Sequence, residues 1–213
     1  MFDLYRHARS PLAWIRLVSG LFSWALAVVL MVKSGLGLGP WDLFHEGLSR
    51  WSGLPMGVIS ELVGLILIVG VLLLRVWPGP GSIANMILIG VFIDLLLPIW
   101  PRQEQPLLQL LSFAAAIPLV GLGSGLYIGA RLGAGPRDSL MLALSKRLGW
   151  SIRRVRTVVE LLVLLAGWLL GGTIGIGTLL FALLIGPAVQ WGMRICGALP
   201  DSGPALKHGE PSA

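Results

Sequence analysis

Residues 36–42, Leu-Gly-Leu-Gly-Pro-Trp-Asp, return as residues 132–138, Leu-Gly-Ala-Gly-Pro-Arg-Asp. The displacement is 96 residues, and it continues beyond this motif without a gap. Further along, the Leu-Ile-Gly at residues 88–90 falls on the Leu-Ile-Gly at residues 184–186. A Leu- and Gly-rich composition alone would hardly keep a seven-residue motif and a distant match in one register. The chain therefore contains two copies of one unit.

The sequence around the repeated motif is strongly apolar. Of the 213 residues, 55% are hydrophobic and only 12% are charged, against about 25% charged in soluble domains, and mean hydropathy is +0.85. A bilayer core needs about 20 apolar residues in a helix. Six segments have that character: 14–33, 56–76, 82–100, 107–130, 152–171 and 175–196. The pattern predicts an all-α membrane protein with six transmembrane helices.

Two segments between these spans are too short to cross a bilayer. They run from residue 39 to 51 and from 135 to 148, and each begins with Gly-Pro. Proline suits the first turn of a helix. Each segment is therefore predicted to be a short half-helix that dips into the membrane or lies at its surface.

The spans define three parts of the chain. Residues 1–13 are predicted to be an N-terminal segment on the cytoplasmic side, and 197–213 a flexible tail rich in Gly, Pro and Ser. The transmembrane domain covers 14–196, with repeat one at about 14–100 and repeat two at about 107–196.

The positive charges predict how the two copies face the membrane. Alternate loops hold thirteen and three of the 16 lysines and arginines, and cytoplasmic loops carry the excess. Both termini of this multi-pass protein are therefore expected in the cytoplasm. Because each copy has three spans, an odd number, the second copy would insert upside down. The copies then form inverted-topology three-helix repeats, an arrangement typical of transporters.

Four motifs resemble one known family. They are G-L-G-x-G-P-W-D at residues 35–42, G-P-R-D-x-L at 135–140, R-x-x-R-T-x-x-E-L at 153–161 and G-G-T-x-G-I-G-T-L at 171–179. Together they are similar to the YczE-like family of small bacterial membrane proteins, grouped with the YyaS and YitT proteins, over about residues 14–191. The resemblance implies a bacterial inner-membrane protein.

Three carboxylates are the main candidates for binding a solute. Asp42 and Asp138 lie at equivalent positions in the first turn of the half-helices, where free N–H groups favour negative charge. Capping is the simpler explanation, and a site between two converging helix ends is the functional one. Glu160 lies half-way along a span, at a spacing that also allows an i,i+4 ion pair with Arg156. The candidate substrate-binding set is Gly39, Pro40, Asp42, Gly135, Pro136, Asp138 and Glu160.

Other residues have simpler explanations. Glu61 and Asp94 lie near the ends of predicted spans, where contact with water explains a charge. Gly121, Gly125 and Gly129 recur every four residues, a spacing that allows close helix packing inside the protein or in a dimer.

The predicted function is a small secondary transporter or permease for an unknown solute or ion, with its site near the membrane midplane between the repeats. No P-loop, nucleophile elbow, dinucleotide fingerprint or metal-binding spacing appears in the sequence, so no enzyme activity, cofactor or metal is expected. The basic residues lie between apolar runs, which excludes nucleic acid as the expected partner. Two alternatives stay open: an assembly protein that supports a larger membrane complex, and the substrate-binding membrane subunit of a multi-part importer. A homodimer or a partner membrane protein is compatible with each.

Overall fold

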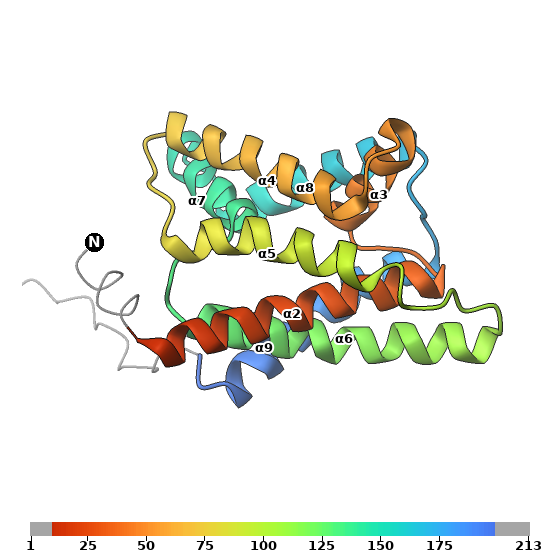
Figure 1. Ribbon diagram of the computed structural model, residues 1–213. Coiled ribbons are helices and arrows are strands. Elements are labelled where there is room, and N and C mark those ends of the chain that lie inside the picture. Colours follow the sequence, from red (N-terminus) through yellow and green to blue (C-terminus); the bar gives the residue numbers. More distant parts are fainter. Residues whose placement is uncertain (1–9, 199–213) are drawn as a thin grey trace, which may run out of the picture.

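The computed structural model describes residues 10–198, and the regular elements in this part of the chain are all α-helices (Figure 1). The predicted all-α class is thereby confirmed. The helices are α2 (Pro11–Ser34), α3 (Pro40–Ser52), α4 (Met56–Leu73), α5 (Pro80–Leu96), α6 (Pro106–Gly129), α7 (Pro136–Leu148), α8 (Ile152–Leu169) and α9 (Ile176–Ile195).

The backbone repeats more faithfully than the sequence. Helices α3 and α7 both have 13 residues, and their starts are 96 residues apart, as are the starts of α4 and α8. Backbone conformations with positive φ also recur at this offset, at Gly35 and Arg131, Gly37 and Gly133, Gly53 and Gly149, and Arg75 and Gly171. The two halves therefore follow one path even where arginine replaces glycine in a conformation that side chains rarely adopt.

The centre of the molecule is an antiparallel pair formed by α2 and α6, one from each half. The Ser23 hydroxyl donates to the Leu119 carbonyl at 2.8 Å, and Trp24 Nε1 donates to Ser124 Oγ at 3.0 Å. Gly20 packs against the backbone of Gly123. The two helices run in opposite directions (Figure 1). The Ser23–Leu119 bond joins equivalent positions of the two copies.

Each half also holds the other half's short helix in place. Helix α3 packs against α8, and α7 packs against α4. The loops that precede the short helices are linked reciprocally: Gly177 N–H donates to the Leu36 carbonyl and Gly81 N–H to the Leu132 carbonyl, both at 2.8 Å. Figure 1 shows α3 and α7 at opposite ends of the long helices. The two Gly-Pro elements thus belong to a single, interlocked structure.

The outer surface is apolar, as a lipid-facing surface requires. Large aliphatic side chains are exposed along α4, α6, α8 and α9, including Ile66, Leu107, Leu161, Leu165, Leu179 and Leu183. Four helices, α2, α4, α6 and α9, are long and apolar enough to cross a membrane. Two of the six predicted spans, α5 and α8, are not among these four helices. Helix α5 has 17 residues, about a turn short of a full span, and α8 carries four charged residues within its 18.

Glycines set the distance between α6 and α9. A methyl group added at Gly121 or Gly125 would collide with the backbone of Ala188 or Gly192. These glycines therefore allow α6 and α9 to pack closely inside the protein, which was one of the two expectations for them, the other being a dimer contact.

The ends of the predicted domain need adjustment. Helix α2 begins at Pro11 rather than residue 14, because proline starts its first turn. Residues 1–9 and 199–213, which hold most of the predicted N-terminal segment and tail, lie outside the described part of the chain.

Candidate functional site

The two short helices start in the same way. Gly39 and Gly135 are their N-cap residues, each followed by proline at the first helical position, as predicted. The start of α7 is further held by Tyr127, whose hydroxyl accepts the Gly135 N–H at 2.8 Å. Because the first N–H groups of a helix have no partner within it, both starts offer backbone donors and the positive end of a helix dipole.

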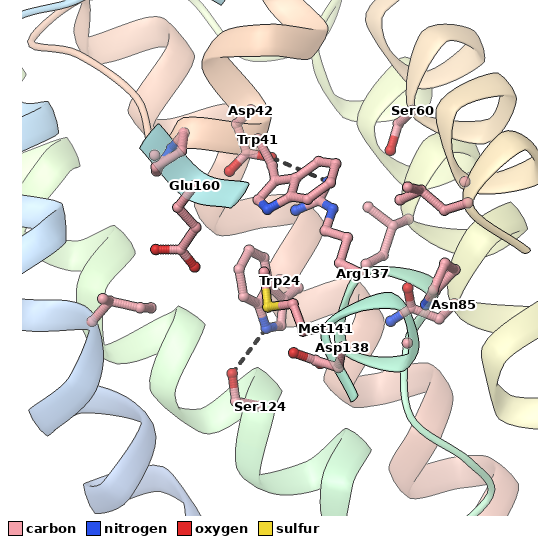
Figure 2. A pocket seen from close by; sticks show the side chains of 18 of the residues that line it. Trp24, Trp41, Asp42, Ser60, Asn85, Ser124, Arg137, Asp138, Met141 and Glu160 are labelled. Atoms are coloured by element: carbon pink, nitrogen blue, oxygen red, sulfur yellow. Dashed lines mark hydrogen bonds and ion pairs between the residues drawn. The ribbon is translucent and has the colours of Figure 1, made fainter. Parts of the chain in front are cut away.

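A cavity of about 500 Å³ lies between these helix starts (Figure 2). All seven residues of the predicted set line it: Gly39, Pro40, Asp42, Gly135, Pro136, Asp138 and Glu160. The fold thus brings together, from α3, α7 and α8, positions that are up to 121 residues apart in the chain (39 to 160).

The α3 side of the cavity holds four polar or aromatic residues, Trp41, Asp42, His45 and Arg137, which we call the inner cluster. Asp42 is 3% exposed and His45 is 1% exposed. The Arg137 guanidinium lies between them: its Nη2 is 3.8 Å from Asp42 Oδ1 and 3.4 Å from His45 Nδ1. Its central carbon lies 5.1 Å from the centre of the Trp41 ring, a cation–π arrangement. Figure 2 shows Arg137, Trp41 and Asp42 facing one another.

The inner cluster is short of hydrogen bonds. The Arg137–Asp42 distance of 3.8 Å exceeds the usual 2.7–3.2 Å for an N–H···O bond, and the 3.4 Å contact of Arg137 with His45 Nδ1 is long. Within residues 10–198, Trp41 Nε1 and His45 Nε2 are buried and have no hydrogen-bond partner. Leaving a buried polar group unpaired costs about 1–3 kcal/mol. The protein therefore maintains hydrogen-bonding capacity here that its own side chains do not use.

The α7 side of the cavity holds a second group, Tyr127, Asp138, Arg156 and Glu160, which we call the mouth cluster. Arg156 Nη2 lies 2.8 Å from Asp138 Oδ1, and its Nε lies 3.5 Å from Glu160 Oε1. The Tyr127 hydroxyl donates to the other Asp138 oxygen at 3.1 Å. The predicted Arg156–Glu160 pair is thus present. The Asp138 and Glu160 side chains are 41% and 38% exposed, so this cluster is open where the inner cluster is closed.

Capping does not account for the contacts of the two first-turn aspartates. The N-cap residues are the glycines, and Asp42 and Asp138 follow three positions later. The contacts described for both carboxylates are with side chains around the cavity, Arg137 for one and Tyr127 and Arg156 for the other. Both aspartates still lie where the helix dipole favours negative charge.

Asp94 and Glu46 are carboxylates with structural partners. Asp94 was expected to be a solvated group near the end of its span. It lies on α5 and accepts the N–H groups of Gly57 at 2.7 Å and Val58 at 3.1 Å, so it caps the start of α4. Glu46 did not stand out in the sequence. It accepts the Thr173 N–H at 2.6 Å and forms an ion pair with Arg50 at 2.7 Å.

Several residues that line the cavity are not among the seven predicted from the sequence. Trp41 and Arg137 occupy equivalent positions of the repeated motif and contact each other in the fold, a relation that their alignment could have suggested. Trp24, His45 and Tyr127 also line the cavity. They come from apolar or scattered positions, and only the crossing of the helices brings them together.

Four long apolar helices with an apolar outer surface define a helical membrane protein. Comparison with known sequences agrees: residues 12–194 match the "Family of unknown function (DUF6198)". The chain belongs to this family, which confirms the resemblance inferred from the motifs.

Named relatives cover most of the chain. It is 41% identical over 185 residues to "Uncharacterized membrane protein YczE" of Bacillus subtilis (strain 168), covering 85% of this chain and 86% of the relative. It is 36% identical over 171 residues to an "Uncharacterized protein" of Haemophilus influenzae, covering 80% and 78%. It is 33% identical over 174 residues to "Uncharacterized protein YyaS" of B. subtilis, covering 78% and 85%. No solved structure matches the chain.

Proposed function

We propose that this protein is a small secondary transporter, or permease, whose solute site is the cavity between the starts of α3 and α7. The observation that carries the proposal is the cavity itself. About 500 Å³ of space is bordered by both repeated Gly-Pro helix starts and by five charged side chains, Asp42, Arg137, Asp138, Arg156 and Glu160. Charged groups inside a membrane protein are expensive and usually serve a pathway or a ligand.

The arrangement of the halves supports this proposal. Transporters with inverted repeats place their sites at the repeat interface, beside discontinuous helices whose ends face the solute. Here the α2–α6 pair is antiparallel and the two Gly-Pro helices lie at opposite ends of it. In our proposal six helices cross the bacterial inner membrane, α5 and α8 included, both termini are cytoplasmic, and α7 is on the cytoplasmic side. The cavity would open to one side of the membrane and then to the other, and this alternation would move the solute across.

The test is solute or proton flux in vesicles that contain the purified full-length protein alone. Asp42→Asn and Asp138→Asn should each abolish flux at unchanged protein abundance, because both carboxylates border the site. Glu104→Gln is the matched control, since Glu104 lies exposed in the loop before α6. Full flux in the Asp42→Asn, Asp138→Asn double variant would refute the proposal.

The same vesicles distinguish a transporter from an assembly protein and from an importer subunit. An assembly protein would show no flux for any solute and would co-purify with a membrane partner. An importer subunit would bind its solute but move it only after its partner subunits are added.

A further inference from the structure

Arg137 is the most unusual group in the cavity. A guanidinium has five N–H donors and no acceptor, yet its contacts with Asp42 and His45 are 3.8 Å and 3.4 Å long. The Trp41 ring covers one face of it. The neighbouring Trp41 Nε1 and His45 Nε2 also have no hydrogen-bond partner in the described part of the chain. Because Arg137 can only donate, His45 Nδ1 accepts and the ring proton lies on Nε2. Donors are thus concentrated at this point, and acceptors are few.

The Arg137 side chain is also the accessible member of its ion pair. It is 27% exposed, against 5% for the Asp42 side chain. The start of α3, with its free N–H groups, lies beside it. A planar guanidinium next to a helix start is suited to a two-oxygen anion, which it can hold through two parallel hydrogen bonds.

The remaining charges of the cavity do not occupy these donors. Asp138 and Glu160 are directed at Arg156 in the mouth cluster, at 2.8 Å and 3.5 Å. Asp42 is the carboxylate that competes with an incoming anion for Arg137. Because it stays beyond ordinary hydrogen-bond distance, Asp42 balances the charge of Arg137 without using its donors.

Most of the remaining wall of the cavity is apolar, with Ser60, Asn85 and Ser124 as its polar members. Met86, Ile89, Phe181, Ile185 and Val189 line it together with the Trp24 ring. Such a wall favours a ligand with a hydrocarbon or aromatic body and disfavours a small hydrated ion.

We infer that the site takes a small amphiphilic carboxylate, with its carboxylate on Arg137 and its apolar body against the wall of Met86, Ile89 and Phe181. This inference rests on the proposed function, because it names the class of solute for the same cavity. The inference also predicts that removing the Asp42 charge strengthens ligand binding, because Asp42 competes with the ligand for Arg137, even though the same change stops transport.

Three probes of one size and different charge test this inference. Benzoate, benzamide and benzylamine are added, at constant ionic strength, to the full-length protein in an uncharged detergent. A ligand that binds the folded state raises the melting temperature, and the rise grows with the ratio of ligand concentration to dissociation constant. Benzoate should raise it in a concentration-dependent manner, benzamide much less, and benzylamine not at all. Stabilisation by benzylamine without benzoate, or no shift with benzoate up to its solubility limit, would overturn the inference.

Variants then locate the binding. Arg137→Gln should lose the benzoate shift, and Arg102→Gln, a matched change in the exposed loop before α6, should keep it. Asp42→Asn should lower the benzoate dissociation constant, obtained from the concentration dependence of the shift, at least several-fold. This gain cannot come from a misfolded variant, so the inference stays testable even if Arg137→Gln fails to fold. An unchanged or weakened benzoate response in Asp42→Asn would contradict it.

The outcome for the ligand is separate from the outcome for transport. Benzoate binding without flux of any solute would refute the transporter and leave the binding site. Flux of another solute, lost in Asp138→Asn and insensitive to benzoate, would refute the carboxylate class and leave the transporter.

Discussion

The two short helices share a backbone but are secured differently. On α3, Glu46 accepts the Thr173 N–H and pairs with Arg50, and Arg50 also donates to the Gly171 carbonyl at 2.6 Å. The positions 96 residues away from Glu46, Arg50 and Thr173 are Leu142, Lys146 and Trp77, which cannot form this network. Instead, they border a second cavity of about 200 Å³.

This difference shows which features the repeat must keep and which it can change. Glycine and proline determine where each short helix starts and ends, so they persist in both copies. The side chains that tie the helix to its neighbours have diverged. The result is an α3 tied by the Glu46 network to the loop before α9, and an α7 that lacks this network and is held at its start by Tyr127 and Arg156. In a transporter built this way, we expect α7 to be the more mobile helix in the state described.

The largest effect is expected from giving α3 the residue of the other copy. Glu46→Leu gives α3 the residue that α7 has at the equivalent position, Leu142. It leaves the Thr173 N–H without its acceptor and Arg50 without its ion-pair partner, although Arg50 keeps its bond to the Gly171 carbonyl. Glu46 is 8% exposed, and losing one partner of a buried polar network costs about 3 kcal/mol. Unfolding of the purified protein in micelles should show this loss.

The reverse change sharpens the comparison. Leu142→Glu adds a carboxylate next to Lys146 at the edge of the second cavity, and it should cost much less than Glu46→Leu. Equal losses for the two variants would mean that α3 and α7 are held equally.

A smaller effect is expected where α9 meets α6. Gly192→Ala should lower the free energy of unfolding by about 2 kcal/mol, since an added methyl meets the backbone of Gly121 and overpacking of this kind is destabilising. Gly70→Ala is the control, because Gly70 lies inside α4 and its position is open. The control should be neutral or gain about 0.5–1 kcal/mol from helix propensity. A Gly192→Ala variant as stable as the control would show that the close approach of α6 and α9 does not constrain this position.

The smallest effect tests the backbone repeat itself. Arg75 has a φ of 60°, and its counterpart Gly171 has a φ of 86°. Arg75→Gly should stabilise the protein by about 0.5–1 kcal/mol, because glycine adopts this conformation without the side-chain penalty. Chemical unfolding at matched protein concentration measures the gain. A loss of stability would show that the Arg75 side chain makes a contact worth more than the strain.

The sequence predicted the parts of this fold that depend on local rules. The helix starts at Pro40 and Pro136 follow from the Gly-Pro steps, and the long helices follow from their apolar runs. The extent of α5 and the charges of α8 show the limit of that reasoning, since apolarity does not fix where a helix ends. Six of the seven predicted residues line one cavity because the repeated motif marks both helix starts, and Glu160 joins them from α8.

The remaining cavity residues could not be predicted, because their neighbours are set by tertiary structure. His45 looked like a scattered histidine, and only the packing of α3 against the second half brings its Nδ1 near Arg137. Asp94 looked solvated because the sequence does not show that α5 returns beside the start of α4. The same holds for Glu46, whose partner Thr173 is 127 residues away.

The central claim is that the two halves are inverted in the membrane, and side-specific labelling tests it most directly. Cys196 is the only cysteine, so Ser52→Cys and Leu148→Cys can be made one at a time in a Cys196→Ser background. These positions are 96 residues apart, exposed, and each at the end of a short helix. In intact bacterial spheroplasts, an impermeant maleimide should label position 52 at once and position 148 only after the membrane is permeabilised. Labelling of both positions from the same side would contradict the inverted arrangement and the transport mechanism built on it.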